Sequence, residues 1–317
     1  MHEGAPEWFT DALTHPGEPG EVLVAGARIR YLAWGDRSAP PLVLVHGGAA
    51  HAHWWAPLAP LLAGDHRVVA LDLSGHGDSD HRDEYPAETW AEEVLAVAAA
   101  AGGAGPPTVV GHSMGGFVTI IVAATRGADL HGAIVLDSPV LRPDPETEEA
   151  SRTGRNLFRA PKTYPDLETA VEHFHLVPPQ PRRHPWLIDH VARTSLREVV
   201  AADGSNGWTW KFDPQLFVTR SGPRLPSEYG PELARAACRL AVVTGERSAI
   251  VDEGVIEHMR ELVAGSPAAA AGVPFVRIPD AHHHLLLDEP LATVTALRAI
   301  LATWSPVGTG PRQVTAS

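Results

Sequence analysis

The chain has 317 residues, of which 44% are hydrophobic and 20% charged, and this composition excludes disorder of the whole chain. Its 38 acidic and 25 basic side chains give a net charge of −13, which argues against binding to a phosphate backbone. The sequence has no run of about 18 apolar residues that could cross a bilayer. We therefore expect neither a nucleic-acid partner nor a membrane partner.

Residues 1–20 carry three prolines and three glycines without periodicity, and we expect them to form a leader before the core. They lack the basic start and apolar run of a signal peptide, which predicts a cytoplasmic protein. Two short strands are predicted next, over residues 22–24 and 28–34. The sequence Ala25-Gly26-Ala27 between them is typical of a hairpin turn.

Six unbroken apolar runs follow, and such runs are typical of strands buried on both faces, as in parallel sheets. They cover residues 42–45, 68–71, 108–110, 133–136, 240–243 and 275–278. Helical patterns cover residues 56–63, 86–101, 114–126, 252–264 and 291–304. Because strands and helices alternate, we predict an α/β fold with a mostly parallel, doubly wound sheet.

One long segment interrupts this alternation after the sixth predicted strand. Between Pro139 and Ala237 the sequence has no core-strand pattern, and a structureless loop of that length is unusual in a compact domain. We interpret the segment as a mainly helical lid inserted into the core. The predicted division is a leader at 1–20, core at 21–138, lid at 139–237, core at 238–306 and a tail at 307–317.

The strongest chemical signal is Gly111-His112-Ser113-Met114-Gly115, a G-x-S-x-G pattern between a predicted strand and a predicted helix. A strand that turns abruptly into a helix forces its central residue into a strained conformation and exposes the serine hydroxyl. The flanking glycines remove side chains that would clash there. The pattern therefore predicts that Ser113 is a nucleophile.

A second glycine motif, His46-Gly47-Gly48, also follows a predicted strand. Backbone N–H groups of Gly48 and Met114 are predicted to form a two-donor oxyanion hole for the reaction of Ser113. We interpret His46 as a structural residue of this loop.

Three consecutive histidines, 282–284, follow the last predicted strand. A metal site is disfavoured, because adjacent side chains on an irregular loop point in different directions. The single Cys238 adds no cysteine cluster and permits no internal disulfide. We expect one of these imidazoles to act as a general base, with neither a metal nor an organic cofactor.

From about residue 20 to 305, these motifs and their order resemble the α/β-hydrolase superfamily of the lid-bearing type. The resemblance implies the α/β-hydrolase fold. When Leu287-Asp288-Glu289-Pro290 is aligned on the end of the family's last loop, the catalytic histidine is His283. His282 then replaces the usual glycine.

The acid of the implied triad has two candidates. The position that most relatives use, three residues after Gly245, is Ser248, which cannot orient an imidazolium electrostatically. Asp137, at the end of the strand after the nucleophile helix, is our first choice. Asp252 is the second, although its position also suits a helix N-cap.

The resulting hypothesis is a serine hydrolase that cleaves a carboxylic ester or lactone through an acyl-enzyme. Alternatives with the same triad are a C–C bond hydrolase, an amidase or a cofactor-free perhydrolase, and a ligand sensor without turnover remains open. The partner is expected to be a small, partly apolar substrate, and the protein a monomer or homodimer. Candidate substrate-binding residues are Trp54, His112, Trp186, Trp208 and Trp210.

Overall fold

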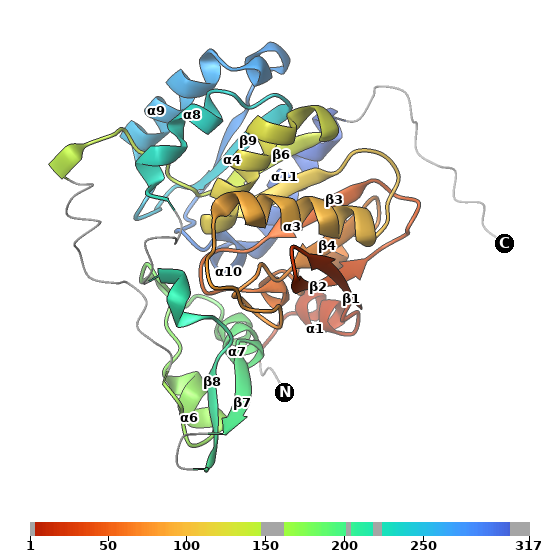
Figure 1. Ribbon diagram of the computed structural model, residues 1–317, viewed down its shortest axis with the longest axis vertical. Helices are drawn as coiled ribbons and strands as arrows, with labels where there is room; N and C mark the ends of the chain where they lie inside the picture. The colour runs from red at the N-terminus through yellow and green to blue at the C-terminus, as the bar shows by residue number, and fades with distance from the viewer. Residues whose placement is uncertain (1–3, 147–161, 201–203, 218–223, 305–317) are drawn as a thin grey trace.

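The computed structural model describes residues 4–146, 162–200, 204–217 and 224–304, and its centre is an eight-stranded sheet (Figure 1). The strand order is β1-β2-β4-β3-β5-β6-β9-β10, parallel from β4 to β10, with β1 and β2 antiparallel at one edge. The strands are β1 Glu18–Val24, β2 Ala27–Trp34, β3 Pro41–Val45, β4 Arg67–Leu71, β5 Thr108–His112, β6 Gly132–Leu136, β9 Arg239–Gly245 and β10 Phe275–Ile278. The predicted fold class is confirmed.

The hairpin between β1 and β2 uses the two residues that the sequence places there. Ala25 and Gly26 have φ values of 44° and 84°, and Val24 pairs with Ala27. Two consecutive positive φ angles are the geometry of a tight hairpin turn that matches the twist of the strands. This turn sets the register of the antiparallel edge.

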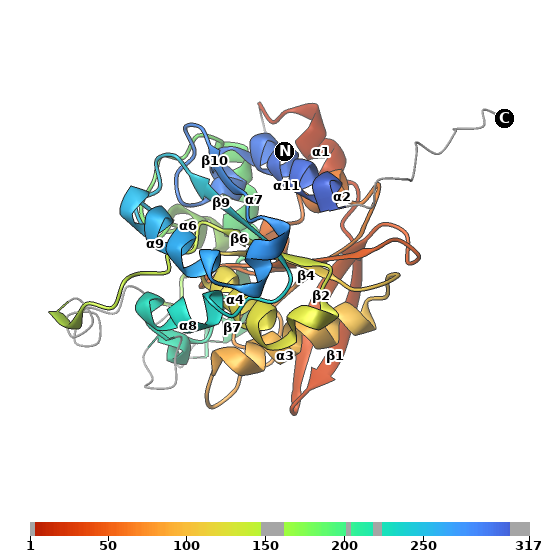
Figure 2. The ribbon, with the colours of Figure 1, turned by 90° about the horizontal axis from the view of Figure 1, so that it is seen from above.

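Helices cover both faces of the sheet (Figure 2), and β3, β4, β5 and β6 are therefore buried at every position. One face holds α1 Glu7–Leu13, α2 Ala59–Leu62, α10 Leu285–Asp288 and α11 Pro290–Trp304. The other holds α3 Ala87–Ala100, α4 Met114–Arg126, α8 Gly230–Leu233 and α9 Glu253–Ala264. Short 3-10 turns are η1 Ala52–Trp54, η2 Gly127–Asp129, η3 Pro214–Phe217, η4 Pro226–Tyr229 and η5 Pro267–Ala271.

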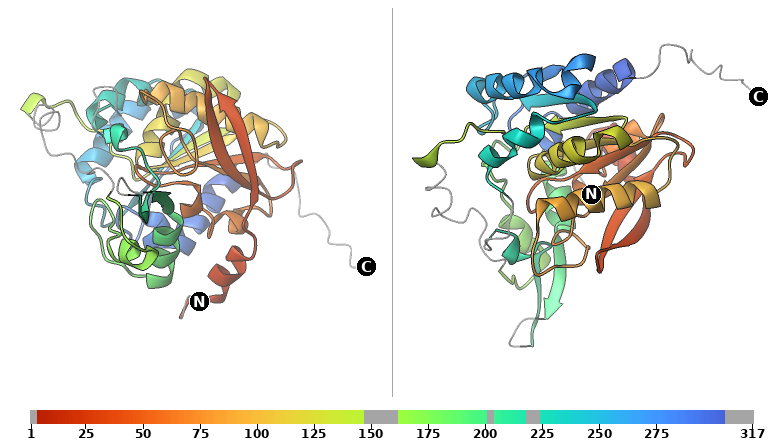
Figure 3. Two further views of the ribbon diagram at one scale, coloured as in Figure 1. Left: turned by 60° about the horizontal axis from the view of Figure 1, so that its bottom comes forward. Right: turned by 45° about the horizontal axis from the view of Figure 1, so that its top comes forward.

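The insertion between β6 and β9 contains a hairpin as well as the helices that the sequence predicts (Figure 3). Its elements include α6 Leu167–Glu172, α7 Pro185–Thr194 and the antiparallel strands β7 Leu196–Val200 and β8 Asn206–Trp210. The sequence Trp208-Thr209-Trp210 forms the end of β8. Its alternation of aromatic and polar residues fits a strand, because every second side chain of a strand faces the same side. A mainly helical description therefore leaves out this two-stranded sheet.

The N-terminal segment joins the core earlier than the predicted boundary at residue 20. Helix α1 lies within it, Phe9 is fully buried, and β1 begins at Glu18. Phe9 packs against Trp186 of α7, with ring centroids 4.5 Å apart. The predicted tail at 307–317 lies outside the described residues. Within the described ranges, every helix is too short or too polar to span a membrane.

Candidate active site

Ser113 lies at the sharp turn between β5 and α4, with φ 54° and ψ −119°. Non-glycine residues seldom adopt a positive φ, so this conformation is strained and must be held by its surroundings. Glycines at two neighbouring positions make the turn possible. A Cβ on Gly111 would lie 2.0 Å from the Gly115 carbonyl oxygen, and one on Gly115 would lie 2.5 Å from that of His46.

The structure joins Ser113, His283 and Asp137 in one hydrogen-bonded chain. The Nε2 of His283 lies 3.1 Å from the Ser113 Oγ, and its Nδ1 lies 2.8 Å from Asp137 Oδ2. His283 is buried and Asp137 fully so, while Ser113 is only partly buried. An Nδ1–H that donates to the carboxylate leaves the Nε2 lone pair facing the serine hydroxyl. This arrangement lets the imidazole remove a proton from Ser113.

Asp137 follows β6 directly and has a φ of 46°. Its Oδ1 accepts the backbone N–H of Gly245 at 2.9 Å, and its Oδ2 accepts the hydroxyl of Ser248 at 2.6 Å as well as the His283 ring. Three donors therefore hold the carboxylate in one orientation. Ser248, the position where the family resemblance would place an acid, instead donates its hydroxyl to the carboxylate that follows β6.

Asp252 has a different place. Its Oδ1 accepts the N–H of Val255 at 2.9 Å, which makes Asp252 the N-cap of α9. This is the structural role that the sequence also allowed for it. The hydrogen bonds to His283 thus favour Asp137 over Asp252 as the partner of the imidazole.

The glycine loop after β3 lies against the nucleophile. A Cβ on Gly47 would be 3.2 Å from the Ser113 Cβ, so the backbone of this loop approaches the elbow closely. His46 is fully buried: its Nδ1 lies 2.7 Å from the Gly47 carbonyl and its Nε2 accepts the N–H of Leu73. These bonds fix the path of the chain into Gly48, which the sequence predicts as an oxyanion donor.

The loop that carries His283 is held from several sides. The ring of His112 bonds to the His283 carbonyl through Nε2 at 2.9 Å, and the side-chain oxygen of Gln180 accepts the N–H of His284 at 2.8 Å. His282 donates its backbone N–H to Asp288 Oδ2 at 2.7 Å, and its Nδ1 lies at the same distance. The histidine at the usual glycine position therefore has a structural partner.

Arg183, from the insertion, contacts the same loop. Its Nε lies 3.3 Å from Asp288 Oδ1 and its Nη1 lies 2.6 Å from Glu289 Oε1. Together with Gln180, it ties the insertion to the segment that positions His283. The sequence suggested for Arg183 only a substrate carboxylate or a solvated surface, and it did not single out Gln180. Neither contact with this loop could be predicted, because the loop lies about a hundred positions away in the chain.

Several buried histidines near the site stay neutral. Burial lowers the pKa of His112 to about 3 and that of His46 to about 4, and it holds the pKa of His284 well below its ordinary value. The physical cause is the loss of hydration of the charged imidazolium. These three imidazoles therefore add no positive charge to the surroundings of Ser113 at neutral pH.

Aromatic rings run from His283 into the insertion. The centroid of His283 is 4.7 Å from that of His284, which is 5.7 Å from Trp54, and Trp54 is 6.3 Å from Phe174. Phe174 lies 5.8 Å from Trp210. Of the predicted substrate-binding residues, Trp54 and Trp210 therefore belong to one continuous row, which includes Phe174, a residue that the sequence did not single out.

The other candidates lie differently. His112 packs beside His283 and supports its loop. Trp186 is partly buried and contacts Trp8 and Phe9 of α1 and the ring of His184, so its described ring contacts are with these residues and not with the triad. Trp208 pairs with the backbone of Tyr164. Within the described residues, the ring and hydrogen-bond contacts of Trp186 and Trp208 given above do not include Ser113, His283 or Asp137.

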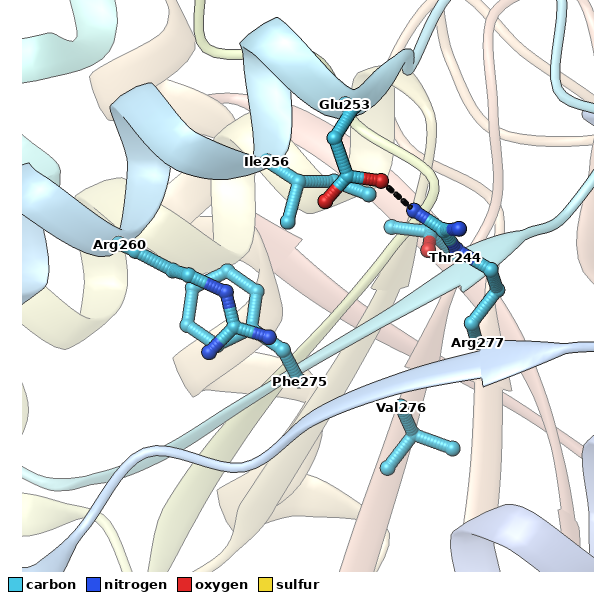
Figure 4. A pocket seen from close by; sticks show the side chains of 7 residues that line it. All are labelled: Thr244, Glu253, Ile256, Arg260, Phe275, Val276 and Arg277. Atoms are coloured by element: carbon cyan, nitrogen blue, oxygen red, sulfur yellow. Dashed lines mark hydrogen bonds and ion pairs between the residues drawn. The ribbon is translucent and has the colours of Figure 1, made fainter.

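A separate pocket lies between α9 and β10 (Figure 4). Its volume is about 290 Å³, and none of its seven lining residues belongs to the chain of Ser113, His283 and Asp137. Glu253 pairs with Arg277, and the guanidinium of Arg260 lies over the ring of Phe275. Two of the charged groups of this hollow, Glu253 and Arg277, are therefore paired with each other, and the third, Arg260, stacks on an aromatic ring.

A second serine–histidine contact ties the insertion to the core. The Nε2 of His51 lies 2.8 Å from the Ser195 Oγ, and this hydroxyl donates to the Val191 carbonyl at 2.6 Å. Its proton is therefore already committed to the end of α7. Burial lowers the pKa of His51 well below its ordinary value.

Comparison with known proteins identifies the family of this chain and relatives whose names refer to different reactions. The model of the alpha/beta hydrolase family matches residues 42–297. Mouse protein phosphatase methylesterase 1 is 36% identical over 141 residues, and mouse epoxide hydrolase 4 is 29% identical over 139 residues. These matches cover 42% and 43% of this chain but only 36% and 38% of the two relatives.

A solved structure extends the similarity to nearly the whole chain. The E-2-(acetamidomethylene)succinate hydrolase has a TM-score of 0.71 at 19% identity, with 90% of this chain and 99% of that chain covered. At this identity the likeness concerns the fold alone. The names of the three proteins refer to a methyl ester, an epoxide and a succinate derivative, so they do not fix the bond that this chain cleaves.

Proposed function

Because the chain belongs to the alpha/beta hydrolase family, we propose that it is a serine hydrolase that cleaves a carboxylic ester or lactone through an acyl-enzyme. The hydrogen-bonded chain from Ser113 through His283 to Asp137 carries this proposal. It supplies a nucleophile, a base and an orienting carboxylate in the order that acyl transfer needs.

In the first half of the reaction, the Ser113 oxygen attacks the ester carbonyl while His283 Nε2 takes the hydroxyl proton. The tetrahedral intermediate carries its negative charge on the former carbonyl oxygen, which the N–H groups of Gly48 and Met114 stabilise. Each such donor contributes on the order of 3 kcal/mol in the transition state. His283 then gives the proton to the departing alcohol as the carbon–oxygen bond breaks, which leaves the acyl-enzyme.

In the second half, water replaces the alcohol and the same groups act again. His283 removes a proton from the water, the resulting oxygen attacks the acyl carbon, and the proton returns to the Ser113 oxygen. Asp137 keeps the imidazole in the tautomer with its proton on Nδ1 and stabilises the imidazolium formed in each half. The products are the carboxylic acid and regenerated serine.

The row of aromatic rings indicates the substrate class. Trp54 and Phe174 extend from the histidine loop toward Trp210 of the hairpin, and an apolar acyl or alcohol group would be stabilised beside them. This row of rings supports the proposal that the substrates are partly apolar esters or lactones. A serine at the elbow argues against epoxide opening, which in this fold uses an aspartate to form an alkyl ester.

The proposal is tested with a panel of p-nitrophenyl esters of increasing acyl length, together with a fluorophosphonate probe. We expect turnover that rises with acyl size, labelling at Ser113, and a loss of at least about 10³-fold in kcat/KM for Ser113→Ala. Wild-type rates equal to background, despite correct folding, would favour the ligand sensor. Turnover of amides or C–C substrates in place of esters would move the activity to one of the alternative hydrolases.

A further inference from the structure

Three histidine rings form a compact cluster beside the nucleophile. One ring nitrogen from each of His112, His283 and His284 lies within 4.8 Å of the others. The ring centroids are 4.8 Å, 4.7 Å and 5.6 Å apart, and all three side chains are buried. The sequence disfavoured a metal at 282–284. It could not show that His112, at the end of β5, lies beside two of these three residues, which follow β10.

His284 supplies an independent indication that the cluster accepts a ligand. Its side chain is only 6% exposed, yet neither ring nitrogen makes a hydrogen bond within the described part of the chain. The Val177 carbonyl lies near the ring without completing such a bond. A buried imidazole without partners loses its hydration and gains nothing in return. A cation bound there would give one of these nitrogens a partner.

We propose that His112, His283 and His284 bind Zn²⁺ reversibly, and that the bound ion blocks catalysis by withdrawing His283 from Ser113. Neutral imidazole nitrogens are preferred zinc ligands at 2.0–2.1 Å. Tetrahedral geometry at that distance places ligand nitrogens about 3.3 Å apart, so the rings must rotate inward from their present spacing. The proposal adds an inhibitory site and leaves the unassisted reaction without a metal.

The bonds of His283 explain why zinc binding and catalysis exclude one another. Its Nδ1 is held by Asp137 and its Nε2 faces Ser113. A bond from Nε2 to zinc uses the lone pair that accepts the serine proton, whereas the bond to Asp137 persists. A carboxylate behind a metal-bound imidazole is a common arrangement, because it orients the ring and raises its basicity. Zinc therefore competes directly with proton transfer at His283 Nε2.

The inhibitory half of this inference rests on the proposed function, so binding and inhibition are measured separately. Binding is measured by competition with a chromophoric zinc chelator, using wild type and Ser113→Ala. We expect one tight equivalent of Zn²⁺ in both proteins. Inhibition of ester hydrolysis in a zinc buffer is measured in parallel, and an excess of chelator should restore activity.

The decisive variant is His284→Phe, which keeps a ring beside Trp54 but removes both nitrogens; His284→Leu replaces it if the first variant does not fold. We expect zinc affinity and zinc sensitivity to fall at least tenfold. His282→Gln, the neighbour outside the cluster, is the matched control and should keep wild-type zinc affinity. Equal zinc affinity in His284→Phe and wild type, or no stoichiometric binding by wild type, overturns the site. Stoichiometric zinc binding by a protein that hydrolyses no ester overturns the proposed function alone.

Discussion

Two of the described serine–histidine pairs, each joined by a hydrogen bond between the serine Oγ and the histidine Nε2, differ in the groups that surround this bond. The pair at the elbow, Ser113 and His283, has the longer contact, at 3.1 Å against 2.8 Å for Ser195 and His51. The elbow pair has Asp137 behind the imidazole and a partly exposed hydroxyl. The second pair is buried, and its hydroxyl already donates to the backbone. A short contact therefore says less about reactivity than the groups on either side of it.

The two serines also differ in backbone conformation. Ser113 is held in a strained conformation, which the glycines of the elbow and the close packing of β3 allow. Ser195 ends an ordinary helix, α7, and contributes to docking of the insertion. Backbone strain at one serine and regular geometry at the other agree with a chemical role for the first and a structural role for the second.

The largest expected effect comes from removing the carboxylate that only the elbow pair has. Asp137→Asn should lower kcat by about 10³-fold, because the amide cannot stabilise the imidazolium and favours the wrong tautomer. Asp252→Asn is the control and should retain wild-type kcat, since asparagine also serves well as an N-cap. The two are compared by steady-state kinetics on one ester. A crippled Asp252→Asn beside an active Asp137→Asn would reverse the assignment of the acid.

The next effect concerns the pH dependence of folding. The pKa of His112 is lowered to about 3 and that of His46 to about 4, so both take up protons in the unfolded chain before they do in the folded one. Their contribution to stability is complete above about pH 6.5 and is lost as the pH falls toward the folded pKa values. At pH 5.5 each of these two histidines lowers the free energy of unfolding by about 1.4 kcal/mol relative to neutral pH. His51 adds a loss of the same sign.

Asp72 acts in the opposite direction, because burial raises its pKa to about 6 and its protonation on acidification favours the folded state. It offsets about 0.8 kcal/mol of the roughly 2.8 kcal/mol that His112 and His46 lose together, and His51 adds to their loss. We therefore expect the free energy of unfolding to fall by at least about 2 kcal/mol between pH 7.5 and 5.5. Urea titrations at several pH values measure this change. A free energy of unfolding that stays constant or rises toward pH 5.5 contradicts the expectation that these histidines are neutral and buried.

The smallest effect on activity is expected at the second pair. Ser195→Ala leaves the buried His51 nitrogen without its partner, which costs about 1–3 kcal/mol of stability. The kcat of Ser195→Ala should stay within about threefold of wild type, because the Ser195 hydroxyl bonds to His51 and Val191 and is not part of the proposed triad. Thermal denaturation and kinetics on the same sample distinguish this from Ser113→Ala, which should lose activity and keep stability. A Ser195→Ala variant as inactive as Ser113→Ala would mean that the wrong serine has been assigned.

Much of this molecule follows from local patterns in the sequence. The unbroken apolar runs predict the core strands, since a strand buried on both faces needs apolar side chains at every position. The elbow is equally local: a serine between glycines, at the change from strand to helix, admits few backbone paths. The order of Ser113, Asp137 and His283 along the chain follows from these elements.

The insertion could not be predicted to the same depth. The hairpin of β7 and β8 lies outside the main sheet, and its strands alternate instead of forming unbroken apolar runs. The direction in which α7 presents Trp186 is one example: the structure places this ring against Phe9 of α1, and the role of Trp186 in substrate binding stays a prediction. No pattern within the insertion alone contains that information.

The sequence by itself predicted the alternation of elements and the strained serine, because each depends on neighbours within a few residues. The resemblance to a family then supplied the short list of possible partners of that serine. Only the tertiary structure brought Asp137, and not Asp252, within hydrogen-bonding distance of His283, placed Ser248 and Arg183 in supporting positions, and brought His112 beside His283 and His284. These arrangements arise where strand ends that are distant in sequence meet at one edge of the sheet. Proximity of that kind is a property of the packed fold, and local spacing does not encode it.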